Sequence, residues 1–129
     1  VVFVVDQSQS MRPEAVEASL RYVTSLAQTK PEGDEVGLVT FGRSAVVEMP
    51  PSIAFPFEGL AIQVDRDGTS LEKALSLAAA VLPEERAGRV VLISDGVETD
   101  GDAARVLDDL KSRGIAVDVL PVAYDYEKE

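Results

Sequence analysis

The stretch VVFVVDQSQS, residues 1–10, opens the chain and decides its fold class. Five apolar residues that end at an acidic one, Asp6, are typical of a strand buried on both faces of a parallel sheet. A second buried run at 89–94 also ends at an aspartate, Asp95. Ligands of open α/β sheets bind outside the carboxyl ends of the strands. If these two strands are neighbours, both aspartates lie at that edge.

Strand and helix patterns alternate along the rest of the chain. Apolar β-prone runs predict strands at 1–5, 36–41, 45–49, 89–94 and 115–120. Apolar residues at helical spacing predict helices at 13–28, from 69 to Pro83, and from 103 to Gly114. This order predicts an α/β fold, a Rossmann-like open sheet that is mostly parallel, with helices on both faces and one antiparallel edge strand.

Local motifs predict how three of these elements begin or join. Gly42 in the first central position of a turn favours a type II′ hairpin between 36–41 and 45–49. Thr69 and Glu72 match a capping box, with Thr69 as the helix N-cap. Asp102 is a candidate cap for the last helix. We expect residues 50–64 to form an irregular connection with a short helical turn near 57–63.

Composition excludes several classes of function. The 129 residues suffice for a single domain with a core of its own, and 46% of them are hydrophobic. With no Cys and no His, the chain offers neither thiolate nor imidazole. Its 23 acidic and 12 basic residues give a net charge of −11. That balance argues against nucleic acid or an anionic membrane as a partner, and it suits a hard cation that prefers oxygen ligands.

Five oxygen-bearing side chains are candidates for one metal site: Asp6, Ser8, Ser10, Thr69 and Asp95. Topology brings the helix that starts near Thr69 to the same carboxyl edge as both aspartates. The donor types favour Mg²⁺ or Mn²⁺, with Ca²⁺ a weaker candidate. Neutral hydroxyls leave such an ion short of negative charge. The site therefore favours a carboxylate supplied from outside the chain.

These residues and their order resemble the von Willebrand factor type A (VWA) domains. The family's metal ion-dependent adhesion site uses an Asp-x-Ser-x-Ser motif after the first strand, a mid-chain Thr and an Asp after the fourth strand. The resemblance implies the strand order 3-2-1-4-5. It implies Ser8, Ser10 and often Thr69 as direct ligands, with Asp6 and Asp95 acting through water or hydrogen bonds. An Asp or Glu of a partner protein would complete the coordination.

The resemblance also bears on the setting of the domain. Family members usually continue with a further strand and helix, so we expect residues 1–129 to be a single VWA-like domain cut from a larger protein and shortened at its carboxyl end. The loops look like those of bacterial members carried in membrane-anchored proteins, which would make this an extramembrane domain. The sequence leaves the compartment and the partner's identity open.

Three functions compete at this point. The favoured one is a metal-dependent binding module without a chemical step. The second is a metal-free scaffold domain. The third is a Mg²⁺-dependent phosphatase that forms an aspartyl-phosphate on Asp6. The haloacid dehalogenase-like phosphatases use Asp-x-Asp at this place, and here Ser8 stands where their second Asp would be. We therefore expect the chain not to be an enzyme.

Overall fold

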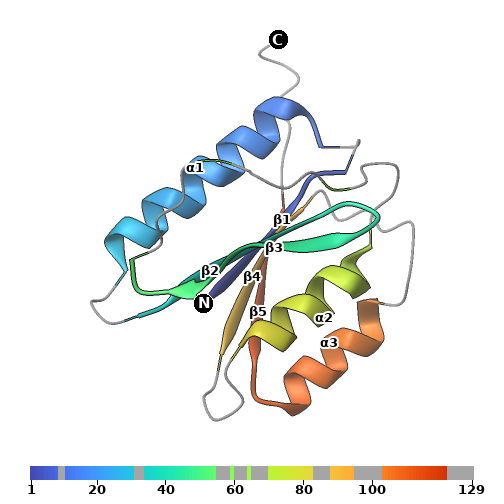
Figure 1. Ribbon diagram of the computed structural model, residues 1–129. Coiled ribbons are helices and arrows are strands. Elements are labelled where there is room, and N and C mark those ends of the chain that lie inside the picture. Colours follow the sequence, from blue (N-terminus) through green and yellow to red (C-terminus); the bar gives the residue numbers. More distant parts are fainter. Residues whose placement is uncertain are drawn as a thin grey trace.

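The computed structural model describes residues 1–8, 11–30, 34–54, 59, 64, 70–82, 88–94 and 103–121. Each strand and helix expected from the sequence is present. The elements are β1 (Val2–Asp6), α1 (Pro13–Thr29), β2 (Val36–Phe41), β3 (Ala45–Ser52), α2 (Leu71–Val81), β4 (Arg89–Ser94), α3 (Ala103–Ser112) and β5 (Ala116–Pro121). The five strands form one sheet in the order β3-β2-β1-β4-β5 (Figure 1). The expected α/β fold and its 3-2-1-4-5 order are therefore confirmed.

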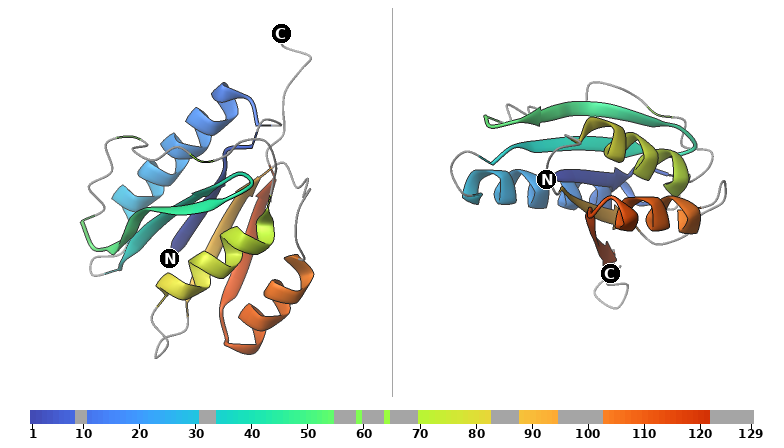
Figure 2. Two further views of the ribbon diagram at one scale, coloured as in Figure 1. Left: turned by 45° about the vertical axis from the view of Figure 1, so that its right-hand side comes forward. Right: turned by 90° about the horizontal axis from the view of Figure 1, so that it is seen from below.

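The sheet lies between two helical layers. Helix α1 covers one face, and α2 and α3 pack together on the other (Figures 1 and 2). Side chains of β1 alternate between these layers, because successive residues of a strand point to opposite faces. Val2 and Val4 join the core under α2 and α3, whereas Phe3 and Val5 join the core under α1. The continuous apolar run of β1 thus reflects its burial on both sides.

Strand register sets up the carboxyl edge of the sheet. β1 pairs in parallel with β2 and with β4. Asp6 lies opposite Phe41 of β2, and Val5 lies opposite Ile93 of β4. The residue after Ile93 is Ser94, so the last residue of β4 arrives beside the last residue of β1.

The hairpin between β2 and β3 differs from the expected turn. Pairing begins at Phe41 and Ala45, which leaves a loop of three residues instead of two. The Gly42 amide donates to the Ser44 carbonyl at 2.8 Å. Gly42 is not among the described glycines with a positive φ, whereas the first central residue of a type II′ turn needs one. The type II′ prediction is therefore wrong. The strands end at the expected residues, 41 and 45, but these bounds leave residues 42–44 as the loop, one residue more than a two-residue turn has.

β3 runs to Ser52, beyond the expected end at residue 49. It passes through Pro50 and Pro51, which lack the amide that a central strand needs. β3 is the antiparallel strand at the edge of the sheet, as expected, and an edge strand tolerates proline on its outer side. Position in the sheet therefore overrides the local breaker residues.

Gly114 ends α3 as expected, with a φ of +78° in the left-handed region that favours glycine. The Asp102 cap and the helical turn near 57–63 lie largely or wholly outside the described residues. In the parts of the chain that are described, no helix has both the length and the apolar composition that a membrane crossing needs.

Thr40 in β2 gives a test of core packing. It is buried, and its Oγ1 has no hydrogen-bond partner among the described residues. Thr40→Val keeps the shape of the side chain and removes the buried hydroxyl. We expect a rise of about 1 kcal/mol in the free energy of unfolding, measured by urea denaturation.

Thr24→Val is the matched control, because the Thr24 hydroxyl donates to the Leu20 carbonyl at 2.9 Å and its loss should not stabilise the chain. A Thr40→Val protein that is less stable than the wild type would contradict this account of the core.

Candidate functional site

Asp6 is a fully buried carboxylate at the end of β1, with 0% of its surface exposed. Its Oδ1 accepts a hydrogen bond from the Ser8 amide at 2.7 Å. Its Oδ2 accepts one from the Ser94 hydroxyl, also at 2.7 Å. A buried carboxylate is costly without such donors, and charge-assisted bonds of this length are strong. Asp6 therefore joins the loop after β1 to the end of β4.

Ser94 is a site residue to which the sequence analysis assigns no role. Its side chain is 1% exposed and lies on the same sheet face as Leu92 and Val90, toward α2 and α3. Asp6 continues the alternation of Val2 and Val4 onto that face. The signal in the sequence is a serine at the last position of a buried strand. That serine can be assigned as a partner of Asp6 only when the register of β1 and β4 is known.

Backbone hydrogen bonds bring two more segments to the loop after β1 at this edge of the sheet. The Gln7 amide donates to the Phe41 carbonyl at 2.7 Å, and the Ser70 amide donates to the Gly42 carbonyl at 2.8 Å. The loop after β1, the β2–β3 hairpin and the start of α2 are thereby held together. Figure 1 shows the ends of these elements along one side of the molecule.

The same loop is stabilised from within. The Met11 amide donates to the Ser8 carbonyl at 2.9 Å, and Met11 is fully buried ahead of α1. Ser8 itself is buried. The loop that carries the Asp-x-Ser-x-Ser motif is therefore anchored by a carboxylate on one side and by an apolar side chain on the other.

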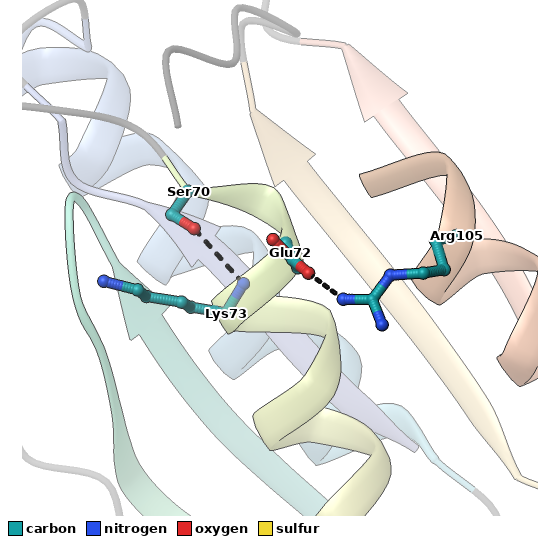
Figure 3. Close-up of polar contacts among 4 residues, drawn as sticks. All are labelled: Ser70, Glu72, Lys73 and Arg105. Carbon is teal, nitrogen blue, oxygen red and sulfur yellow. Dashed lines mark hydrogen bonds and ion pairs between the residues drawn. The ribbon is translucent and has the colours of Figure 1, made fainter. Parts of the chain in front are cut away.

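The N-cap of α2 is Ser70, and the prediction of Thr69 is wrong by one residue. The Ser70 Oγ accepts a hydrogen bond from the Lys73 amide at 3.3 Å (Figure 3). Both residues carry a hydroxyl, so their type alone could not separate them. The helix begins at Leu71, and the residue just before a helix provides the capping oxygen.

Glu72, in the first turn of α2, has a partner on a neighbouring helix. Its carboxylate forms an ion pair with the Arg105 guanidinium of α3 (Figure 3). That contact joins the first turns of α2 and α3 on the face of the sheet opposite α1. The acidic residue in the first turn of α2 thus contributes to the contact between the two helices.

Two of the five predicted site residues, Asp6 and Ser8, lie in the described part of the chain, and the structure brings them together. Ser10, Thr69 and Asp95 fall outside the described residues and stay predictions. Thr69 directly precedes Ser70 and Asp95 directly follows Ser94 in the chain. Both described neighbours are buried at the carboxyl edge.

The donor chemistry at this edge fits a hard divalent ion. Asp6 and Ser8 offer oxygen atoms, and the chain has no imidazole or thiolate. Within the described ranges, no group of three or more acidic side chains could hold a metal. An ion at Asp6 would thus need hydroxyl oxygens and the predicted residues outside those ranges.

Comparison with known proteins agrees with this topology. The family model of the von Willebrand factor type A domain matches residues 1–98, more than half of the chain. The aerotolerance-related membrane protein of Bacteroides fragilis is 26% identical with a TM-score of 0.77, over 94% of this chain and 66% of that one. BatB of Bacteroides thetaiotaomicron is 23% identical with a TM-score of 0.82, over 97% of this chain and 67% of that one.

A more distant similarity shows the fold alone. The ArnB paralog VWA2 of Sulfolobus acidocaldarius is 23% identical with a TM-score of 0.66, over 92% of this chain and 32% of that one. Among curated proteins, none matches the sequence significantly. This chain spans about two thirds of the length of the two Bacteroides proteins. On the family match and the shared sheet topology, the chain belongs to the von Willebrand factor type A domain family.

Proposed function

We propose that the chain is a protein-binding module whose partner contact depends on Mg²⁺ or Mn²⁺. VWA domains typically mediate protein–protein interactions, and the metal dependence is the new element of the proposal. The observation that carries it is the buried carboxylate of Asp6, which holds the Ser8 loop against the end of β4. The residues proposed to hold the ion are Asp6, Ser8, Ser10, Thr69 and Asp95.

The bound ion would supply an electrophilic centre that accepts one carboxylate oxygen from an Asp or Glu of the partner. The chain's own residues would do the rest. Asp6 orients the Ser8 backbone through Oδ1, and Ser94 orients Asp6 through Oδ2. Outer contacts of this kind fix the ligands of a metal and tune its affinity.

The capping of α2 supports a role for Thr69. A single hydroxyl does not readily serve both a helix cap and a metal ion. Because Ser70 caps α2, the helix does not require the Thr69 hydroxyl. Thr69 thus remains a candidate ligand without cost to the helix.

We further propose that the module performs no chemical step. A nucleophilic aspartate needs an oxygen that is free to attack phosphorus. Both carboxylate oxygens of Asp6 accept short hydrogen bonds, and the general acid expected two residues later is replaced by Ser8. These contacts favour a structural and orienting role for Asp6.

Metal binding can be measured by calorimetric titration of chelator-treated protein with Mn²⁺. We expect the wild type to bind, and we expect Asp6→Asn and the double variant Ser8→Ala, Ser10→Ala to lose at least about tenfold in affinity. Ser19→Ala is the matched serine control, since Ser19 is buried in α1 and donates to the Ala15 carbonyl. A wild type that binds no ion at millimolar concentration would favour the metal-free scaffold function.

Ser94→Ala tests the positioning role of Ser94. Loss of a buried hydrogen bond to a carboxylate should lower the free energy of unfolding by about 2 kcal/mol. It should also weaken Mn²⁺ binding about tenfold. Ser94→Thr keeps a hydroxyl and should recover some of both losses. If Ser94→Ala were as stable as Ser19→Ala and bound Mn²⁺ equally well, Ser94 would have no such role.

Hydrolysis of p-nitrophenyl phosphate with Mg²⁺ tests the absence of a chemical step. We expect a wild-type rate equal to that of Asp6→Asn. A Mg²⁺-dependent rate that disappears in Asp6→Asn would establish the phosphatase function instead.

A further inference from the structure

An ion pair joins α2 and α3 at the ends of these helices that lie nearest the candidate site. Both helices begin at the carboxyl edge of the sheet, as Figure 1 shows. Glu72 lies in the first turn of α2, and its carboxylate contacts the guanidinium of Arg105, the third residue of α3 (Figure 3). The pair therefore connects the two helix starts beside the site.

Each of these helices follows a connection that contains a predicted metal ligand. Thr69 lies three residues before Glu72 in the sequence, and Asp95 belongs to the connection between β4 and α3. The two helix starts are the points at which these connections end. The ion pair, which joins the helix starts, therefore sets the separation of those two points.

The same pair brings α3 into a ring of contacts around the carboxyl edge. The start of α2 is hydrogen-bonded to the β2–β3 hairpin, and the end of β2 is hydrogen-bonded to the loop after β1. That loop is joined through Asp6 to the end of β4. The chain itself connects β4 to α3, and the ion pair connects α3 back to α2. A change in the spacing of the helix starts can therefore reach Asp6 and Ser8 through described contacts.

The placement of Arg105 costs its own helix stability. A positive charge in the first turn of a helix is disfavoured by the helix dipole. The carboxylate of Glu72 offsets this cost, and its side chain is only 23% exposed, which reduces screening by salt. A residue that breaks a local stability rule in this way is a candidate for function.

We propose that Glu72 and Arg105 are positioning residues of the metal site. Their ion pair sets the spacing of the α2 and α3 starts, and through it the spacing of the segments that carry the ligands. The inference rests on the proposed function, and neither residue is proposed to touch the ion or the partner. A metal site weakens when its supporting contacts are lost, even when each ligand is still present.

Calorimetric titration with Mn²⁺ distinguishes positioning from a simple effect of charge. Glu72→Gln removes a negative charge near the site, so weaker binding by that variant fits either explanation. Arg105→Gln removes a positive charge, which by electrostatics alone would strengthen the binding of a cation. Positioning predicts the opposite sign, and we expect Arg105→Gln to weaken Mn²⁺ binding about threefold. Arg105→Lys keeps a cation and should recover part of this loss.

Arg113→Gln is the matched control. Arg113 directly follows α3 and donates to the Ala79 carbonyl of α2 at 3.3 Å, so it also joins the two helices, at their ends away from the site. Its neutralisation removes the same charge as Arg105→Gln. It should leave Mn²⁺ binding equal to that of the wild type or slightly tighter.

The double variant Glu72→Gln, Arg105→Gln completes a double-mutant cycle. If the two residues act as a pair, the double variant should bind Mn²⁺ no more weakly than the weaker of the two single variants. Thermal unfolding of each variant shows that the titrated protein is folded. In the absence of metal, the Ser70 amide should exchange its hydrogen faster in Arg105→Gln than in Arg113→Gln, because the start of α2 is held less firmly.

The outcomes separate this inference from the proposed function. If the wild type binds Mn²⁺ and Arg105→Gln binds it as tightly as Arg113→Gln does, the positioning role is wrong and the metal-dependent function stands. The same holds if the two single losses add in the double variant. If the wild type binds no Mn²⁺, both proposals fail together.

Discussion

The burial of one carboxylate constrains the whole carboxyl edge of this domain. Asp6 is removed from water at the end of the central strand, and its ionised form is tolerable there only with well-placed donors. Those donors come from the loop after β1 and from the end of β4, two segments far apart in sequence. Satisfying one side chain therefore determines where both segments lie. The two cores on either side of β1 give this arrangement a rigid base.

Sequence patterns predict the elements well because a strand that is buried on both faces has a continuous apolar sequence, which is easy to recognise. The continuous apolar runs of β1 and β4 could be neither amphipathic helices nor exposed strands. The strand order came from the family resemblance, since periodicity alone does not say which strands are neighbours. The role of Ser94 could not be predicted for the same reason: its hydroxyl reaches Asp6 only because β4 lies next to β1 in one particular register.

Three smaller predictions were wrong because they rested on local motifs alone. The cap of α2 was placed at Thr69 because adjacent hydroxyl residues, Thr69 and Ser70, are equivalent as residue types. Gly42 favours a two-residue turn, but the strands end at the expected residues, 41 and 45, and leave a loop of three residues. β3 continues through Pro50 and Pro51 because the edge of a sheet leaves one row of amides unused. In each case the structure depends on where the residue lies in the fold, which a local sequence motif does not specify.

The proposed donor set also explains why ion and partner would depend on each other. The proposed site, with its hydroxyls and the buried, hydrogen-bonded carboxylate of Asp6, would offer less negative charge than one built from several free carboxylates. Its intrinsic hold on a divalent ion would be correspondingly modest. A partner carboxylate adds the missing charge, so each binding event strengthens the other by the same factor. In the proposed site, the hydrogen bonds from Ser8 and Ser94 to the two oxygens of Asp6 would fix the shape of this edge, and they would leave a bound cation only partly neutralised.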